Sequence, residues 1–450
     1  MSTQPEHNNT LDQLSSALDS GELKRMRFML NKGLRPVEAA KLLEKTPPRE
    51  RQILWNLVSK ENEGKVLQHL GDDVQADIVS RMDASELLAA TEGLDSDDMA
   101  DMMQQMPERL MREVLRIMDK QNRKRVEKLL SYPEDTAGGL MNTDTVTIRP
   151  DITVETVLRY LRRHTDVPQD TDSLFVVSRK DSFIGVLPLT RLLTSDPQVM
   201  VREIMRTEQA AIPATLPDQE VARLFEDEDL VSAPVVDESG KLLGRITIDD
   251  VVDVIREDAD HSLMSMAGLD EDEDTFAPVL RTTRRRAVWL GINLITAFIA
   301  SAVIGLFEGT LEQVVALAVL MPIVASMGGI AGSQTLTLVI RGQALGHIER
   351  GNIGWLFNRE LIAGALNGTL WALVVAAVAV VWFGDTTVGI VIALAIVINL
   401  LAGAMAGTLL PMALKSAGID PALAGSVLLT TITDVVGFFA FLGLATLFFG

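Results

Sequence analysis

The chain has 450 residues, no cysteine and a formal net charge of −20, and at roughly 150 residues per domain this length predicts about three domains. The charge is uneven, because residues 281–450 carry 8 Lys and Arg against 7 Asp and Glu, which leaves 33 against 54 for residues 1–280. This balance excludes a basic nucleic-acid binder, and the lack of cysteine excludes disulfides and thiolate metal sites. The polar first ten residues lack the apolar core of a signal peptide, so we expect the acidic part to stay in the cytosol.

A helical repeat is predicted over residues 21–135, after a disordered start over residues 1–20. Residues 70–82 match residues 94–106 at an offset of 24, and residues 118–130 continue the period. A period of this length, with apolar residues at helical spacing, is typical of stacked helical hairpins that form a superhelix. Its methionines are predicted to belong to the core: Met99, Met102, Met103 and Met106.

A second repeat occupies residues 136–200 and 201–258. Val176 and Gly185 align with Val235 and Gly244 at a constant offset of 59. Each copy is predicted to contain a strand, a helix, two strands joined by a tight turn, and a second helix. This order resembles a tandem pair of cystathionine-β-synthase (CBS) domains.

In the CBS family a Gly-x-x-Thr-x-x-Asp motif can hold the ribose and phosphate of an adenosine nucleotide. The second copy matches it with Gly244, Thr247 and Asp250, whereas the first copy has neither Thr nor Asp at the corresponding positions. The alternative is structural, because Asp249 and Asp250 would also cap and charge the start of a helix.

Acidic residues gather in both repeats. On a helix, carboxylates four residues apart face the same side and repel, and a divalent cation would offset this repulsion. Oxygen ligands without His or Cys favour Mg²⁺ or Ca²⁺. The alternative is a solvated acidic surface, but two such faces next to a membrane domain favour a cation sensor. Its candidate ligands are Asp95, Asp97, Asp98, Asp101, Asp249, Asp250, Asp253, Glu257 and Asp258.

Residues 259–285 are predicted to connect the CBS pair to the membrane through a helix. Within them the acidic run 270–274 is interpreted as a solvated charge block.

Residues 286–450 are predicted to form a membrane domain of five helices, because about 20 apolar residues span a bilayer. The positively charged segments before the first span and between the second and third spans should be cytoplasmic, which places the C-terminus outside. The predicted spans are about 287–308, 313–340, 360–384, 386–412 and 421–448.

Asp434 is the one charge near the middle of any predicted span. An ionised carboxylate there is costly unless it faces water, a cation or a partner, so Asp434 is a functional candidate by default. Thr430, Thr431 and Thr433 add hydroxyl groups just before it. A protonated Asp434 bonded to a neighbouring helix is the alternative.

Several segments resemble the MgtE family of magnesium channels, over essentially the whole chain. They are Tyr-Pro-Glu-Asp-Thr-Ala-Gly-Gly-Leu-Met at 132–141, Pro-Val-Val-Asp at 234–237, Ile-Thr-Ile-Asp-Asp-Val at 246–251, Gly-Gly-x-x-Gly-x-Gln at 328–334, Asp-Pro-Ala-Leu at 420–423 and Thr-Asp-Val-Val-Gly at 433–437. The implied fold class combines an all-α superhelical N domain, α/β tandem CBS domains and an all-α transmembrane domain.

The resemblance implies a homodimeric, Mg²⁺-selective channel of the inner membrane rather than an enzyme. The second and fifth spans would line the pore, with Asp434 as the ion-selecting aspartate. Mg²⁺ bound between the cytosolic domains and the connecting helix would close the pore, and ATP on the CBS pair would tune this response. The implied pore residues are Asp434, Gly328, Gly329, Gln334 and Thr433.

The second span departs from the family motif, since Ile330 and Ser333 stand where the family commonly has asparagines. This departure leaves selectivity among divalent ions open. A channel or carrier for Co²⁺ or Ca²⁺, and a membrane-anchored adenylate sensor without transport, remain as alternatives.

Overall fold

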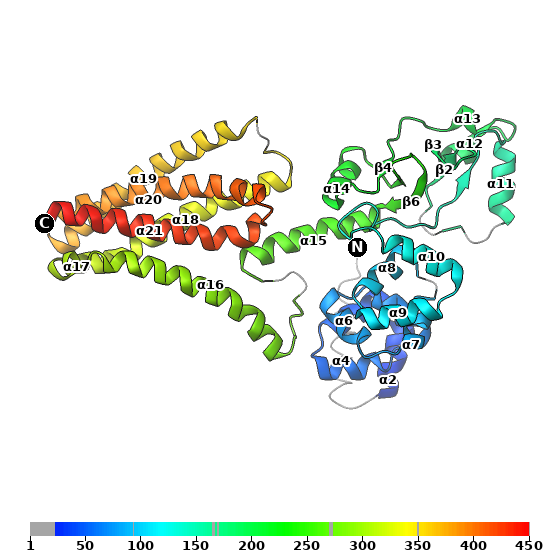
Figure 1. The fold of residues 1–450 in the computed structure, drawn as a ribbon, viewed down its shortest axis with the longest axis horizontal. Helices are drawn as coiled ribbons and strands as arrows, with labels where there is room; N and C mark the ends of the chain where they lie inside the picture. Colours follow the sequence, from blue (N-terminus) through cyan, green and yellow to red (C-terminus); the bar gives the residue numbers. More distant parts are fainter. Residues whose placement is uncertain are drawn as a thin grey trace. The chain divides into compact units, whose positions relative to one another are not determined.

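A computed structural model describes residues 23–449, apart from residues 93, 164–166, 169–170, 270–272 and 349–350. The predicted disordered segment 1–20, Arg350 and the first three residues of the acidic run lie outside the described residues. The chain divides into two compact units, of which the first comprises Met1–Asp260 with Asp272–Pro278 and the second His261–Glu271 with Val279–Gly450. Figure 1 shows the elements of both units.

The first unit begins with short helices that follow a strict period. Helices start at residues 36, 60, 84 and 108, and a second set starts at residues 48, 72, 96 and 120, so both sets repeat every 24 residues. Consecutive helices of the first set pack against each other, which confirms the predicted helical superhelix. The helices are α2 (Leu23–Phe28), the π-helix η1 (Met29–Gly33), α3 (Pro36–Glu44), α4 (Pro48–Trp55), α5 (Lys60–Leu67), α6 (Asp72–Val79), α7 (Ala84–Thr91), α8 (Ser96–Gln104), α9 (Glu108–Ile117) and α10 (Lys120–Leu129).

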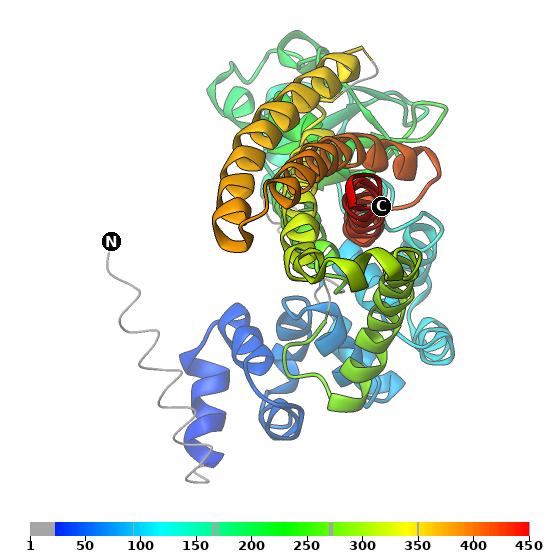
Figure 2. The ribbon, with the colours of Figure 1, turned by 90° about the vertical axis from the view of Figure 1, so that its left-hand side faces the viewer.

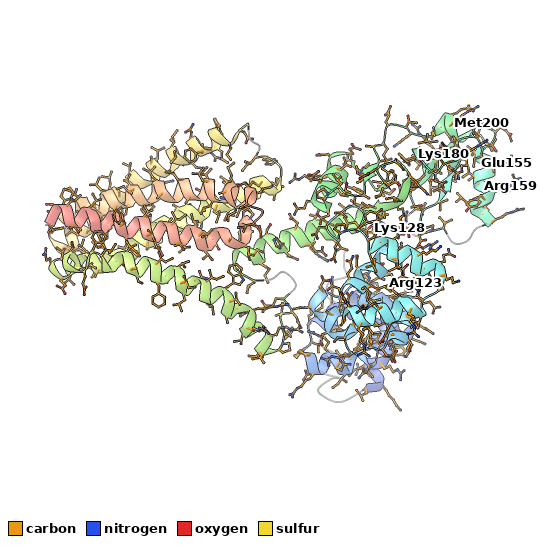
Figure 3. All side chains as sticks on the ribbon, in the orientation of Figure 1. Arg123, Lys128, Glu155, Arg159, Lys180 and Met200 are labelled. Atoms are coloured by element: carbon orange, nitrogen blue, oxygen red, sulfur yellow. The ribbon has the colours of Figure 1, made fainter. Side chains whose placement is uncertain are left out.

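The core of this array is apolar. The four methionines of α8 and its C-terminal turn are buried, as predicted, with exposed fractions between 0% and 7%. Most charged side chains of the array lie outside, as for Arg123 on α10 (Figure 3).

The two CBS copies have the same topology. In each, a short strand pairs in parallel with a middle strand, which pairs antiparallel with the next. Val176 faces Gly185 and Val235 faces Gly244, so the register preserves the offset of 59 and confirms the duplication. The elements are β1 (Thr147–Ile148), α11 (Val154–Arg163), β2 (Ser173–Val177), β3 (Phe183–Pro188), α12 (Leu189–Thr194), α13 (Val201–Ile204), β4 (Ile212–Pro213), α14 (Asp218–Asp227), β5 (Ser232–Val236), β6 (Leu242–Thr247) and α15 (Ile248–Met266).

The connection to the membrane differs from the predicted helix over 259–285. Residues 259–266 end α15, residues 279–285 begin the next long helix, and the described residues between them are not helical. The predicted solvated run is also wrong at Asp274, whose side chain is 7% exposed.

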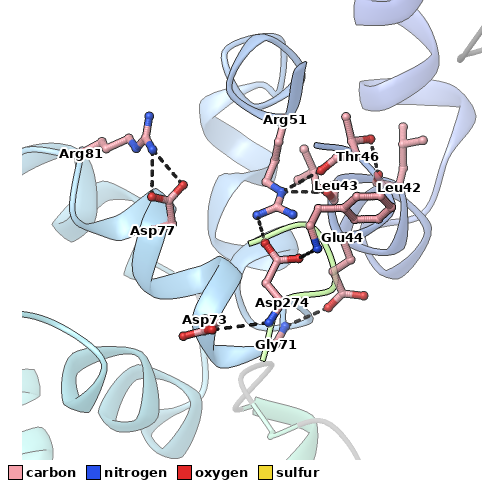
Figure 4. A network of polar contacts seen from close by, with 11 residues as sticks. Leu42, Leu43, Glu44, Thr46, Arg51, Gly71, Asp73, Asp77, Arg81 and Asp274 are labelled. Atoms are coloured by element: carbon pink, nitrogen blue, oxygen red, sulfur yellow. Dashed lines mark hydrogen bonds and ion pairs between the residues drawn. The ribbon is translucent and has the colours of Figure 1, made fainter. Parts of the chain in front are cut away.

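Asp274 is buried because it is paired with the helical array (Figure 4). Its Oδ2 lies 2.8 Å from NH1 of Arg51 in α4, whose side chain is 2% exposed. Arg51 Nε also donates to the carbonyl oxygens of Leu43 and Thr46. A buried ion pair is stable only when its polar atoms make further hydrogen bonds within the protein. The pair of Arg51 and Asp274 holds the segment before Val279 against the helical array.

The second unit is a bundle whose helices include five that are long and apolar enough to cross a bilayer. Helix α20 packs against α18, α19 and α21 and is the most buried of the five (Figure 2). The elements are α16 (Val279–Gly305), the short α17 (Glu308–Gln313), α18 (Val315–Ala344), α19 (Ile353–Phe383), α20 (Thr386–Ser416) and α21 (Pro421–Phe449). Together the two units confirm the predicted fold class.

Candidate cation sites

Three carboxylates converge at the start of α8. Asp95 precedes this helix, and Asp97 and Asp98 lie in its first turn. One oxygen from each of the three lies within 4.8 Å of the others. Converging carboxylate oxygens are the donors that Mg²⁺ and Ca²⁺ prefer.

Asp97 is the buried member of this group, with an exposed fraction of 8%. Burial, and then the nearby Asp250 and Asp98 carboxylates, raise the pKa of Asp97 well above its usual range. Its Oδ1 has no hydrogen-bond partner within the described part of the chain. An unmet buried acceptor destabilises a fold, and a cation bound there would satisfy it.

Carboxylates of α15 face this group within the first unit. Burial, followed by Asp95 and Asp249, raises the pKa of Asp98 to about 6. Burial, followed by Asp249, raises the pKa of Asp250 to about 7, although the Thr247 hydroxyl donates to Asp250 at 2.9 Å. The acidic clusters of the helical array and the second CBS copy therefore lie together.

Asp101 extends the group toward a residue that sequence reasoning missed. Although the Asp101 residue is exposed, desolvation of its carboxylate raises its pKa to about 8, and Glu134 makes the largest contribution among its neighbouring charges, which include Glu257. Glu134 lies in the 132–141 segment that carries the family resemblance, but no pattern of spacing links it to α8.

The remaining candidates also have neighbours outside this group, although the charge of Asp253 contributes to the raised pKa of Asp98. Asp253 lies 3.2 Å from Arg256 on its own helix, and Asp258 accepts a hydrogen bond from Gln219 Nε2 of α14 at 2.7 Å. Asp249 is exposed and acts on Asp98 and Asp250 through its charge.

The three residues of the nucleotide motif have different surroundings. A Cβ added at Gly244 would lie 2.6 Å from the Asn142 carbonyl oxygen, so this glycine is required by close packing of the backbone. Thr247 and Asp250 bond to each other at the start of α15 through both the backbone N–H and the hydroxyl of Thr247. Asp250 therefore belongs both to the motif and to the carboxylate group.

A recess opens on the surface of the second unit. Gly329, Ile330, Ser333, Gln334 and Thr337 of α18 line it together with Thr430 of α21. The two residues that depart from the family motif are thus part of its wall.

The predicted pore residues divide between this recess and the helix interfaces. Asp434 lies four residues after Thr430, so the two share one face of α21. Gly328 instead packs against α20. Thr433 is 0% exposed, and its hydroxyl donates to the Leu429 and Thr430 carbonyl oxygens.

The end of α15 contacts the bundle within the second unit. His261 Nε2 lies 3.0 Å from Asp420 Oδ2, just before α21. Met266 packs against an apolar cluster that includes Leu336 of α18 and Leu429 of α21. The C-terminal end of α15 therefore contacts both helices that line the recess.

Comparison with known proteins agrees with this architecture. Family models match residues 34–135 as the MgtE intracellular N domain, residues 137–196 and 201–257 as CBS domains, and residues 321–444 as MgtE, a divalent cation transporter. The chain is 31% identical to the magnesium transporter MgtE of Bacillus subtilis (strain 168) over 96% of its own length and 95% of that protein. The chain belongs to the MgtE family.

Other MgtE proteins extend the comparison. The magnesium transporter MgtE of Thermus thermophilus is 32% identical over 96% of this chain and 97% of that protein. A crystal structure of the cytosolic domain of the Mg²⁺ channel MgtE in complex with ATP is 35% identical, with a TM-score of 0.50, and covers 54% of this chain and 99% of that chain. These MgtE relatives are transporters and channels by name. With the five apolar helices, they identify an integral membrane protein.

Proposed function

We propose that this protein is a Mg²⁺-selective channel for Mg²⁺ uptake that closes when cytosolic Mg²⁺ is high. The observation that carries the proposal is the recess on α18 and α21, whose wall includes hydroxyl and amide groups, with Thr430 on the same helix face as Asp434. A carboxylate flanked by hydroxyl and amide groups can hold a cation through its hydration shell.

A homodimer is part of this proposal. Ser333, Gln334, Thr337 and Thr430 are exposed on helices that are otherwise apolar. Polar groups facing lipid are costly, and a second copy placed against this face would enclose them with two Asp434 residues. The N-terminal domains would be cytoplasmic and the C-terminus outside, as the distribution of Arg residues favours.

The carboxylate group of the first unit is the proposed Mg²⁺ sensor. The positive charge of bound Mg²⁺ would offset both the burial and the mutual repulsion that raise the pKa values of Asp97, Asp98 and Asp250. Without that charge the carboxylates of α8 and α15 repel each other. Helix α15 would then move, and Met266 would leave the cytoplasmic ends of α18 and α21.

ATP is proposed as a modulator because the cytosolic domain of an MgtE channel has been crystallised with it. Thr247 and Asp250 would hold its ribose. Because Asp250 also faces Asp97, nucleotide and Mg²⁺ would act on one carboxylate. Loss of ATP binding in Thr247→Ala, measured by calorimetry on the full-length protein, tests this assignment.

Influx into proteoliposomes with an internal Mg²⁺ indicator tests the channel. Asp434→Asn should abolish influx, whereas Asp385→Asn, which alters only the cap of α20, should retain it. The pair Asp97→Asn and Asp250→Asn removes both the repulsion and two Mg²⁺ ligands, so influx through this variant should no longer depend on the cytosolic Mg²⁺ concentration. Co²⁺ or Ca²⁺ influx without Mg²⁺ influx would replace the proposed substrate, and absence of any flux from folded protein would refute transport.

A further inference from the structure

Asn399 of α20 is a fully buried amide in the centre of the bundle, with an exposed fraction of 0%. Its Nδ2 donates to the Val324 carbonyl oxygen of α18 at 2.8 Å. Its Oδ1 is buried and has no hydrogen-bond partner among the described residues. An amide with an unmet acceptor destabilises an apolar bundle, whereas a leucine of similar volume would fill the same space without that cost.

The carboxamide lies between two glycines from different helices. A Cβ added at Gly328 of α18 would lie 2.2 Å from Asn399 Nδ2, and a Cβ added at Gly437 of α21 would lie 2.6 Å from the same atom. Both backbones therefore touch the amide directly, and neither position has room for a side chain.

These two glycines adjoin the proposed ion path. Gly328 precedes Gly329, which lines the recess, and Gly437 follows Asp434 by three residues. Pro322 lies inside α18 and has no N–H to donate to the turn before it. The carbonyl that loses its donor to Pro322 is that of Ala318, four residues earlier, so the hydrogen bond from Asn399 to Val324 is additional to the helix and does not replace the missing one.

We propose that Asn399 is a positioning residue that sets the separation of α18 and α21 at the level of Gly329 and Asp434. This inference rests on the proposed channel function and deepens it. The amide acts as a spacer that fixes α18 through its hydrogen bond and α21 through direct contact with Gly437.

A size exchange tests the spacer. Gly328→Ala should reduce Mg²⁺ influx about tenfold, the effect expected if the lost contact is comparable to one buried hydrogen bond. Adding Asn399→Ala should restore most of the influx, because it removes the atoms that the new methyl group meets. Gly443→Ala on α21, whose Cβ would meet only Phe307 at 3.9 Å or beyond, is the matched control and should leave influx unchanged.

Asn399→Leu separates positioning from simple packing. It keeps the volume and removes the hydrogen bond, so we expect a changed Mg²⁺ concentration dependence and a changed ratio of Co²⁺ to Mg²⁺ influx in protein of normal thermal stability. A Leu variant with natural concentration dependence and ratio would overturn the inference, as would a double variant no more active than Gly328→Ala. If the natural protein passes no ion, the channel function fails and the inference fails with it. Failure of the inference about Asn399 alone is distinguishable, because in that case the natural protein shows normal Mg²⁺ influx.

Discussion

The cost of keeping a buried charge within the carboxylate group, from burial first and then from repulsion, can be measured by removing one charge and keeping its shape. The pKa of Asp250 is raised to about 7 from an ordinary value of 3.8, and one pKa unit corresponds to about 1.36 kcal/mol. Holding Asp250 ionised in the Mg²⁺-free protein at pH 8 therefore costs roughly 4 kcal/mol. Asp250→Asn removes this cost but weakens the hydrogen bonds from Thr247 by about 1 kcal/mol. We expect a net gain of roughly 2–3 kcal/mol in local stability.

Hydrogen exchange of α8 and α15 in the full-length protein, in EDTA at pH 8, measures this gain as slower exchange. Mg²⁺ should slow exchange strongly in the natural protein and much less in Asp250→Asn, because the variant has lost both the repulsion and a ligand. Asp260→Asn is the control, since Asp260 lies on the same helix but is exposed. Equal or faster exchange in Mg²⁺-free Asp250→Asn, or equal protection by Mg²⁺ in both proteins, would refute the reasoning.

Three further predictions concern the first unit. Because the folded-state pKa values of Asp98 and Asp250 are raised to about 6 and 7, the folded protein binds more protons than the unfolded chain above about pH 4. The free energy of unfolding without Mg²⁺ should therefore fall as pH rises from 4 to 8, and a stability that does not change with pH would contradict the pKa values. Mg²⁺ binding at pH 7 should release protons, which calorimetry detects as a binding enthalpy that depends on the ionisation enthalpy of the buffer. Arg51→Met should destabilise the helical array by about 3–5 kcal/mol, whereas Arg51→Met with Asp274→Leu should be near neutral; equal losses of protection in hydrogen exchange would count against a buried pair. Gly64→Ala should lower the free energy of unfolding by about 1–3 kcal/mol, since its Cβ would lie 1.8 Å from the Ala90 carbonyl oxygen. Gly33→Ala is the control, because its Cβ would meet only Met29 at 3.8 Å, and this variant should have the same unfolding temperature as the natural protein.

Features that repeat or continue along the chain could be predicted from the sequence. The offset of 24 gave the helical array, and the offset of 59 gave both CBS copies, including the tight turns where Asp181 and Gly240 have positive φ. The spans followed from hydropathy alone. The acidic faces of α8 and α15 were also predicted, because carboxylates at helical spacing need a counter-charge whatever the fold.

Contacts between residues far apart in sequence could not be predicted in this way. Asp274 was assigned to solvent because a charge block usually is, and only the fold brings Arg51 beside it. No sequence pattern singled out Asn399 or Glu134. Each has its role because of a neighbour that no local pattern specifies.

The pairing of Arg51 with Asp274 brings the first domain of the chain into contact with the segment that follows both CBS copies. The helical array comes first in sequence and is separated from the first spanning helix by both CBS copies, yet Asp274 is five residues before Val279, where α16 begins. A shortened protein without residues 1–135 would thus lose more than a domain. The shortened protein would lack Arg51, so the Asp274 carboxylate, five residues before α16, would have no partner in the helical array. A change in its ion flux would therefore reflect the altered segment before α16 as well as the loss of the proposed sensor.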